Sequence, residues 1–553
     1  MLKILLLYCK NSQVFIHCWI DNSENHSIDF IERFESFMQQ NTNVLFVVFD
    51  DLNDSISGMG GHPQAKTPNL DRLMQCGVRF TNAQCNAPIC GPSRASFLSG
   101  IYPHNSGFFG YEMFANSWMK NLVLKNTRTF MEHFRENGYA VCGTGKIFHH
   151  NDEKWEVWDD TEGIRYFGVK PDFGPYPWDG TEKKRTWGYN NLPHPSLPSN
   201  FITDDLFARL SDIPEYRKDE AKGIPGYKGW ILGKEPYKYV NAQDRDFLPD
   251  EASAQYAVNA LKTGFDSPFL MCVGFIRPHA PLIVPDEFFD MFPLEEIETT
   301  TMLENDLYDC AKTLWEGTPD LWTGNFGRGR YKRLMEGGGA ELLKKFTQAY
   351  LASVAFADAQ LGKVLNALES SPYAENTLIV VTSDNGFHMG EKEQLYKNTV
   401  WEEAARVPLI IAGPGVKKNA QCTHPVSLID IYPTLTDYCN ISSNPHGNIE
   451  LDGYSLRTLL ENPEEDKWDG PDIAITAVAS SFPVPLDTPA QKKDQHYSVR
   501  SKRFRYVLCR NDEEELYDHD NDPYEWKNLA QHPDYNEIKK YLRKCLIEIT
   551  GCR

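Results

Sequence analysis

Four short, continuous apolar runs constrain this chain more than any other feature of its sequence. They cover residues 43–49, 269–275, 377–382 and 407–412, and they are rich in β-branched and aromatic residues. A strand that is buried on both faces has this composition, because helices cover both sides of its sheet. Stretches with apolar residues at helical spacing, 129–137 and 342–368, lie between the runs. The alternation predicts an α/β fold in which helices sandwich a large, mixed, mostly parallel sheet.

The sequence changes character on either side of this α/β region. Residues 1–40 show no clear pattern, and we expect an N-terminal extension that is disordered or mis-started. A catalytic domain is expected over 41–465, in which 151–240 forms long loops. Residues 497–501 and 505–509 are typical of antiparallel strands, and 537–550 of a closing helix. We therefore predict a smaller C-terminal α/β subdomain over 466–553.

The charge of the chain limits its partners. The formal net charge is -21, which argues against nucleic acid, because binding phosphates needs clustered Lys and Arg. An anionic substrate would be repelled by the overall field, so cations inside the pocket would have to recruit it. The sequence contains no run of about eighteen apolar residues, the length that a membrane-spanning helix needs.

Acidic and amide side chains follow two of the predicted strands. Asp50 and Asp51 come directly after residues 43–49, and Asp384 and Asn385 follow residues 377–382. Ligands of such sheets lie beyond the carboxyl ends of the strands. Four hard oxygen donors suit Ca²⁺ or Mg²⁺ better than zinc. Asp50 and Asp51 can both reach one ion only if the backbone turns between them; a cap or a turn is the alternative role for this pair.

Cys90 lies in the motif Cys90-Gly-Pro-Ser-Arg94, which is followed by a helical pattern. A residue at a helix N-terminus meets the positive end of the helix dipole, which favours an anion. A thiolate there could act as a nucleophile. No neighbouring motif supplies the Cys–His pair of a thiol hydrolase, so the residues alone leave the chemistry of Cys90 open.

The motif matches the Cys-x-Pro-Ser-Arg signature, and the chain resembles the formylglycine-dependent sulfatases of the alkaline phosphatase superfamily. The resemblance runs from Asn43 to residues 515–518, through 67–73, 145–149, 277–279 and 383–397 in the order of the family. It is closest to iduronate-2-sulfatase-like enzymes that act on glycosaminoglycans or on algal polysaccharides such as ulvan. One departure is Ser99-Gly100-Ile101, where the family usually has Thr-Gly-Arg.

The resemblance implies an alkaline-phosphatase-like fold and a modified nucleophile. A formylglycine-generating enzyme would oxidise Cys90 to Cα-formylglycine (3-oxoalanine), whose hydrate attacks the sulfur of the ester. Asp50, Asp51, Asp384 and Asn385, together with residue 90, would hold one divalent cation, Ca²⁺ with Mg²⁺ as the alternative.

The resemblance also implies the roles of the remaining site residues. Arg94, Lys146 and Lys397 would bind the sulfate, and His149 would take a proton from the hydrate. His279, with Lys397, would protonate the departing sugar oxygen, and His388 would face the substrate or lie just behind it.

Three functions remain open at this point. The first is a sulfatase of sulfated oligo- or polysaccharides, periplasmic or secreted, although the sequence carries no convincing signal peptide. The second is a phosphodiesterase or phosphonate monoester hydrolase of the same superfamily. The third is a non-catalytic protein that binds sulfated glycans and leaves Cys90 unmodified.

Overall fold

A computed structural model describes residues 42–110, 117–149, 154–159, 165–178, 180, 207–212, 221, 226, 228–316, 326–464, 468–480 and 491–552. The chain divides into two compact units, residues 1–41 and 42–553. The predicted N-terminal extension lies outside the described residues, and the elements named below belong to the second unit. None of the described helices is both long enough and apolar enough to cross a membrane.

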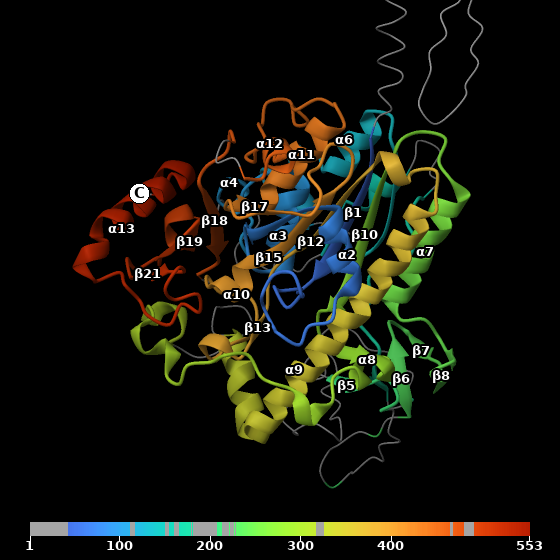
Figure 1. The fold of residues 1–553 in the computed structure, drawn as a ribbon, viewed down its shortest axis with the longest axis horizontal. Helices are drawn as coiled ribbons and strands as arrows, with labels where there is room; N and C mark the ends of the chain where they lie inside the picture. Colours follow the sequence, from blue (N-terminus) through green and yellow to red (C-terminus); the bar gives the residue numbers. More distant parts are fainter. Residues whose placement is uncertain are drawn as a thin grey trace, which may run out of the picture. The chain divides into compact units, whose positions relative to one another are not determined.

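An eight-stranded sheet forms the centre of this unit (Figure 1). Its order is β16-β2-β15-β12-β1-β10-β3, and β17 also pairs with β2. The strands are β1 (Asn43–Asp50), β2 (Gly77–Gln84), β3 (Ala140–Gly145), β10 (Phe269–Pro278), β12 (Thr377–Ser383), β15 (Arg406–Ala412), β16 (Ala420–Cys422) and β17 (Val426–Ser427). All pairs are parallel except those of β15, which runs antiparallel to β12 and β2. The predicted mixed, mostly parallel sheet is confirmed.

Each face of the sheet is covered by its own apolar core. Along β1, Leu45 and Phe49 belong to one core, whereas Val44 and Val48 belong to the other. Successive side chains of a strand point to opposite faces, so a strand with helices on both sides needs apolar residues at every position. This is why residues 43–49 form an unbroken apolar run.

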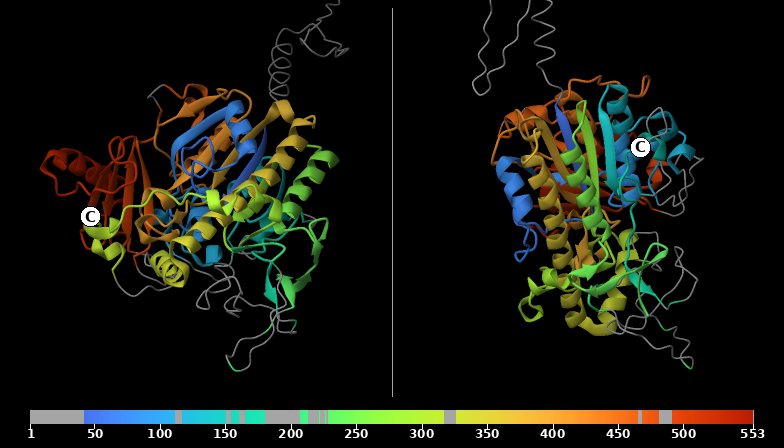
Figure 2. Two further views of the ribbon diagram at one scale, coloured as in Figure 1. Left: turned by 60° about the horizontal axis from the view of Figure 1, so that its bottom comes forward. Right: turned by 90° about the vertical axis from the view of Figure 1, so that its right-hand side faces the viewer.

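The helices form two layers around the sheet. One core includes residues of α2 (Pro68–Cys76), α7 (Pro249–Thr263) and α9 (Phe326–Glu369). The other includes residues of α3 (Cys90–Ser99), α6 (Phe130–Glu136), α11 (Ile431–Tyr438) and α12 (Arg457–Glu461). Figure 2 shows the yellow α9 and the green α7 running together along one side of the strands.

Both predicted helices are present. The helix α6 begins with a capping box, in which the Thr129 hydroxyl accepts from the Glu132 amide and the Glu132 carboxylate accepts from the Thr129 amide. The helix predicted over 342–368 is the C-terminal part of α9, which begins earlier, at Phe326. A non-helical Gly339 (φ 58°) separates the two parts, and glycine tolerates this conformation because it has no Cβ.

A four-stranded antiparallel sheet lies near the C-terminus, as predicted. It consists of β18 (Ile473–Val478), β19 (His496–Ser501), β20 (Phe504–Leu508) and β21 (Glu514–Asp518). The helix α13 (Asn536–Thr550) shares an apolar core with one set of strand residues. Another set, which includes Val478, Val507 and Tyr517, shares a separate core with Val400 and Trp401. The sheet therefore packs against the segment that precedes β15. A domain boundary near residue 465 remains a prediction.

The other described elements are short. Within the predicted loop region 151–240, of which only part is described, lie β4 (Tyr176–Trp178), β5 (Phe207–Arg209), β6 (Gly229–Leu232) and β7 (Glu235–Tyr237), with β8 (Tyr239–Asn241) at its end. Elsewhere lie β9 (Asp244–Arg245), β11 (Leu282–Val284), β13 (His388–Met389), β14 (Leu395–Tyr396), α4 (Pro103–Ser106), α5 (Ser117–Lys120), α8 (Asp286–Asp290) and α10 (Glu402–Ala405).

Candidate active site

The four predicted oxygen donors meet at one edge of the central sheet. The strands β1 and β12 are parallel neighbours in which Phe49 is opposite Ser383, so the residues after each strand emerge side by side. The Asp51 amide donates to Asp384 Oδ1 at 3.2 Å, and Asn385 Nδ2 donates to Asp51 Oδ1 at 2.8 Å. The backbone turns at Asp51, which has a φ of 67°. This turn meets the condition under which Asp50 and Asp51 can serve one site.

The same group contains buried oxygens that lack a hydrogen bond. Asp50, Asp51, Asp384 and Asn385 are all 0% exposed. Asp50 Oδ1, Asp51 Oδ2 and Asn385 Oδ1 accept no hydrogen bond from any described residue. A buried polar atom without a partner is costly, and a hard divalent cation prefers oxygens of this kind. The residues present therefore fit a divalent cation.

Cys90 lies beside these oxygens. It is the first residue of α3 and is fully buried. Metal-ligating atoms of Asp50, Asp51, Cys90 and His279 all lie within 4.8 Å of one another. Lys397 Nζ donates to Cys90 Sγ at 2.8 Å and also pairs with Asp51. The fold thus brings the candidate nucleophile and the candidate cation ligands together in one site.

The surroundings of Cys90 favour negative charge. Burial alone would raise the pKa of the Cys90 thiol, but the ammonium groups of Lys146 and Lys397 outweigh burial and hold this pKa well below its usual value. The N-terminus of α3 adds its positive dipole end in the same sense. A nucleophile or a transferring anionic group at position 90 is stabilised by the same cations.

Arg94 connects the nucleophile helix to the carboxylates. Its Nε donates to Asp384 Oδ2 at 2.8 Å, and Nη1 donates to the carbonyls of Lys146 and Ile147. Its Nη2 lies 3.7 Å from Asp50 Oδ1 and donates no hydrogen bond to a described residue. Arg94 therefore orients the carboxylates and retains the N–H groups of Nη2 for a further oxygen.

Lys146 and His279 lie at the ends of two further parallel strands, β3 and β10. Lys146 pairs with Asp50, and its Nζ lies 4.7 Å from the centre of the Phe173 ring. The His279 ring lies 4.8 Å from the same ring. Phe173 belongs to the loop region 151–240, in which no periodicity or motif marks it in the sequence.

The protonation of His279 follows from its contacts. Its Nδ1 lies 2.5 Å from the Ala280 carbonyl oxygen. A carbonyl only accepts, so Nδ1 carries a proton and Nε2 is the nitrogen that titrates. Nε2 lies 3.7 Å from Asp51 Oδ2. Burial would lower the pKa of His279, but Asp50 and Asp51 outweigh burial and raise it. His279 can therefore present a proton to the site.

His149 lies beside the start of α3, whereas His388 lies beside the segment after Lys397. The His149 ring is buried against Gly91, where a Cβ would lie 3.9 Å from it, so His149 adjoins the residue after Cys90. His388 is 0% exposed; its Nε2 is 2.6 Å from Thr399 Oγ1, and its ring packs near Trp401. Burial lowers the pKa of His388 to about 3. His388 thus contacts the segment after Lys397, and none of its described hydrogen bonds reaches the four oxygen donors.

One supporting residue is not marked by any sequence motif. The Tyr350 hydroxyl donates to the Asp51 carbonyl at 2.7 Å and accepts from the Asn53 amide at 3.0 Å. It thereby fixes the backbone turn at Asp51. In the sequence, Tyr350 is one of many apolar and aromatic residues at helical spacing in α9, so the pattern marks it only as part of the core.

Residue 90 and His279 apart, the charged side chains of the site balance before any cation is added. Asp50, Asp51 and Asp384 carry three negative charges, and the neighbouring Arg94, Lys146 and Lys397 carry three positive charges. A divalent cation would leave the site with a net positive charge. Such a site attracts an anion in spite of the net charge of -21 on the chain.

A small pocket adjoins the segment after Lys397. Its lining includes Asn398, Thr399, Trp401, Ser480 and His496. Thr399 Oγ1 and the Trp401 indole are already bonded to His388 and Glu515, so these two lining groups serve the fold.

Comparisons with known proteins agree with this geometry. The sequence model of the sulfatase family matches residues 42–441, and that of the C-terminal part of N-sulphoglucosamine sulphohydrolase matches residues 390–551. A sulfatase of Formosa agariphila is 32% identical over 498 residues, covering 88% of this chain and 83% of the relative. Human iduronate 2-sulfatase is 26% identical, covering 84% of each chain.

A solved structure has the same fold. It contains a protein bound to its substrate D-glucosamine-2-N,6-O-disulfate, and it aligns with a TM-score of 0.63 over 93% of this chain and 98% of the other. The identity is 21%, so this likeness concerns the fold alone.

Proposed function

Because the chain belongs to the sulfatase family and is therefore a sulfuric ester hydrolase, we propose that it removes sulfate from a sulfated oligo- or polysaccharide. The names of its relatives support a carbohydrate substrate, since one acts on iduronate and a structural neighbour binds a disulfated glucosamine.

One observation carries the proposed mechanism: Cys90 Sγ lies beside both the Lys397 ammonium and a group of buried carboxylate oxygens. We infer that Cys90 is oxidised by a maturation enzyme to Cα-formylglycine, which supplies, once hydrated, an oxygen nucleophile for the ester sulfur. One divalent cation, Ca²⁺ with Mg²⁺ as the alternative, would be held by Asp50, Asp51, Asp384, Asn385 and residue 90, and would supply positive charge against the sulfate oxygens.

The side chains around position 90 then have distinct tasks. Lys146, Lys397 and Arg94 Nη2 bind and orient the sulfate oxygens, since each carries a positive charge within the site. His279 Nε2 donates its proton to the departing sugar oxygen. His149, which adjoins Gly91, accepts a proton from the side chain at position 90 when sulfate is released.

Release of inorganic sulfate from a panel of defined sulfated oligosaccharides tests this proposal. The enzyme should release sulfate from at least one of them and hydrolyse aryl phosphate or phosphonate esters far more slowly. Cys90→Ala should abolish the activity, and the peptide that contains Cys90 should have lost its sulfur in the active protein, as mass spectrometry can report. Faster hydrolysis of phosphonate esters would favour the phosphonate hydrolase instead. Tight glycan binding without turnover, by protein produced together with a maturation enzyme, would favour a binding protein.

We further propose a periplasmic or secreted location. A sulfated polymer does not cross a cytoplasmic membrane, so an enzyme that acts on one must meet it outside that membrane. Fractionation of the native host with an antibody against this chain tests the location, and recovery with cytoplasmic markers alone would contradict it.

A further inference from the structure

The segment that carries Lys397 has little regular structure of its own. It runs from Tyr396 at the end of β14 to Glu402 at the start of α10. Tyr396 and Asn398, on either side of Lys397, have φ values of 70° and 71°. Residues other than glycine rarely adopt this conformation, and each instance costs on the order of 1 kcal/mol unless the surroundings enforce it. The placement of Lys397 beside Cys90 therefore depends on contacts from elsewhere in the fold.

Three of these contacts come from the C-terminal antiparallel sheet and the loop that follows it. Arg505 Nη1 donates to the Val400 carbonyl at 3.2 Å. The Trp401 indole donates to Glu515 Oε2 at 2.9 Å, and the Glu402 amide donates to Glu525 Oε2 at 3.1 Å. Three consecutive residues, the first of them only three positions after Lys397, are thus held by side chains more than 100 positions away in the sequence.

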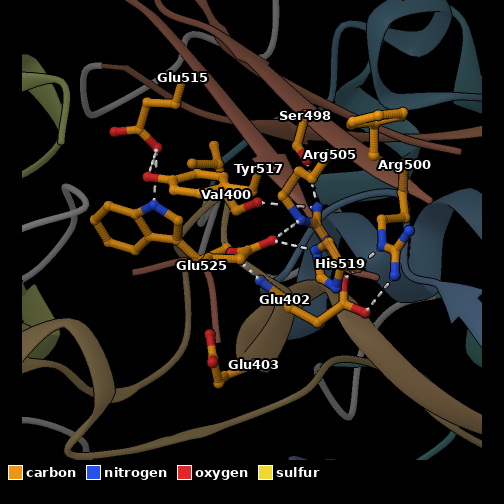
Figure 3. Close-up of polar contacts among 12 residues, drawn as sticks. Val400, Glu402, Glu403, Ser498, Arg500, Arg505, Glu515, Tyr517, His519 and Glu525 are labelled. Carbon is orange, nitrogen blue, oxygen red and sulfur yellow. Dashed lines mark hydrogen bonds and ion pairs between the residues drawn. The ribbon is translucent and has the colours of Figure 1, made fainter. Parts of the chain in front are cut away.

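Arg505 is the centre of this arrangement (Figure 3). It is 0% exposed. Its Nε pairs with Glu525 Oε1 at 2.6 Å, and its Nη2 pairs with Glu402 and also donates to Gln84 Oε1 at 3.1 Å. The remaining nitrogen, Nη1, donates to Ser498 Oγ and to Val400. All three nitrogens of the guanidinium are therefore used, which a lysine ammonium could not reproduce.

The same group superficially resembles a metal site. Ligand atoms of Glu402, His519 and Glu525 lie within 4.8 Å of one another. Arg500 Nε lies 3.1 Å from Glu402 Oε2, however, and Arg505 pairs with both carboxylates. Two arginines therefore already neutralise the two glutamates, and a cation would be repelled. Burial would raise the pKa of Glu525, but Arg505 and His519 outweigh burial and lower it to about 2.

From these contacts we propose that Arg505 is a positioning residue, which holds the segment 400–402 in place and so keeps the Lys397 ammonium beside residue 90. The C-terminal sheet thus contributes to the reaction by supplying the side chains that hold the segment 400–402. The inference rests on the sulfatase activity proposed above, because the loss that it predicts is a loss of turnover. Displacing a catalytic group by about 1 Å can lower a rate on the order of 100-fold.

A double-mutant cycle tests whether Arg505 acts through Lys397. The variants are Arg505→Met, Lys397→Ala and their combination, assayed on a fluorogenic aryl sulfate well below the melting temperature of each. We expect Arg505→Met to lower kcat between about 10-fold and 100-fold. In the Lys397→Ala background the same change should lower kcat less than about 2-fold, because the group that it positions is already absent. Equal losses in both backgrounds would overturn the proposal.

Arg503→Met is the matched control. Arg503 lies two residues before Arg505 and pairs with Asp518 at 2.6 Å, but its side chain is 45% exposed. This variant should leave kcat unchanged. Arg505→Lys is the second variant in case Arg505→Met does not fold. It keeps the buried positive charge but loses the planar guanidinium group that bonds several partners at once. It should lower kcat in the same Lys397-dependent way, and a kcat equal to that of the wild type would contradict the proposal.

Hydrogen exchange in the peptide that covers residues 396–405 supplies a readout independent of activity. We expect exchange there to accelerate at least about 10-fold in Arg505→Met and to stay unchanged in Arg503→Met. Unchanged exchange in Arg505→Met would overturn the proposed positioning role of Arg505. If the wild-type protein releases no sulfate, the proposed function fails, whereas the exchange data still decide whether Arg505 holds this segment.

Discussion

The role of His279 as a proton donor predicts that replacing it lowers kcat/KM mainly for substrates whose leaving group needs a proton. Nδ1 is committed to the Ala280 carbonyl at 2.5 Å, and Nε2 faces the site 3.7 Å from Asp51 Oδ2. His279→Gln keeps a polar side chain of similar reach but has no proton that it can transfer at neutral pH. A sugar alkoxide is a poor leaving group, whereas a nitrophenolate leaves without protonation.

The expected magnitude follows from this difference. General acid catalysis contributes about 100-fold to 10,000-fold, so His279→Gln should lower kcat/KM for a sulfated sugar by about that factor. For 4-nitrophenyl sulfate we expect a loss below about 10-fold, since only the placement of the ring is disturbed. The ratio of the two losses, at least about 10-fold, corresponds to about 1.4 kcal/mol or more of barrier specific to protonation.

The pH dependence supplies a second measurement on the same enzyme. The protonated form of His279 is the active one, so kcat/KM for the sugar substrate should fall as the pH rises through the pKa of His279 in the free enzyme. Asp50 and Asp51 raise that pKa in the cation-free site, whereas a divalent cation held by the same two carboxylates would offset this effect. Equal losses on both substrates, or a variant that keeps the alkaline limb, would refute the role of His279 as the acid.

Three further predictions concern charge in the site and in the core. Lys397→Met should lower kcat/KM by about 100-fold to 1,000-fold. The control Lys417→Met, at an exposed lysine, should leave kcat and KM unchanged. Removal of divalent cations by a chelator should abolish activity and lower the melting temperature, because a cation at 100 times its Kd stabilises the folded state by about 2.7 kcal/mol. In Asp51→Asn, calorimetry should show little increase in melting temperature on addition of Ca²⁺. An increase as large as that of the wild type would argue against Asp51 as a ligand. Burial lowers the pKa of His104 and His388 to about 3 and that of His446 and His496 to about 4, so unfolding takes up protons below the ordinary pKa of histidine. Each of these histidines therefore destabilises the fold as the pH drops below about 6.5, by about 1.4 kcal/mol per histidine at pH 5.5. Burial also raises the pKa of Asp430 and Glu515 to about 7, and these carboxyls act in the opposite sense over the same range. The measurement is therefore the difference between the wild type and His104→Phe, which can keep the stacking on Tyr102: the variant should gain about 1.4 kcal/mol of relative stability between pH 7.5 and 5.5, and an unchanged difference would refute this.

Much of the fold was readable from local patterns. Residues 43–49 and 377–382 were predicted to be strands covered on both faces, because short apolar runs rich in β-branched residues are typical of such strands. The parallel neighbours β1 and β12 then end at the same edge, which is why Asp51 and Asp384 could be grouped from their places after the two apolar runs. The antiparallel direction of β15 was not readable, since it leaves no periodic signal.

The sequence by itself determined which chemical groups the site contains, because residue types and their places after strands and at a helix start are local properties. It supplied the nucleophile candidate Cys90, the oxygen donors and the surrounding cations. Only the tertiary structure decided how these groups are held. Tyr350 on the Asp51 carbonyl and Arg505 on the Val400 carbonyl act across more than 100 residues of chain. Such contacts depend on which buried groups the packing brings together, and a single sequence carries no signal of which partner a buried hydroxyl or guanidinium will meet.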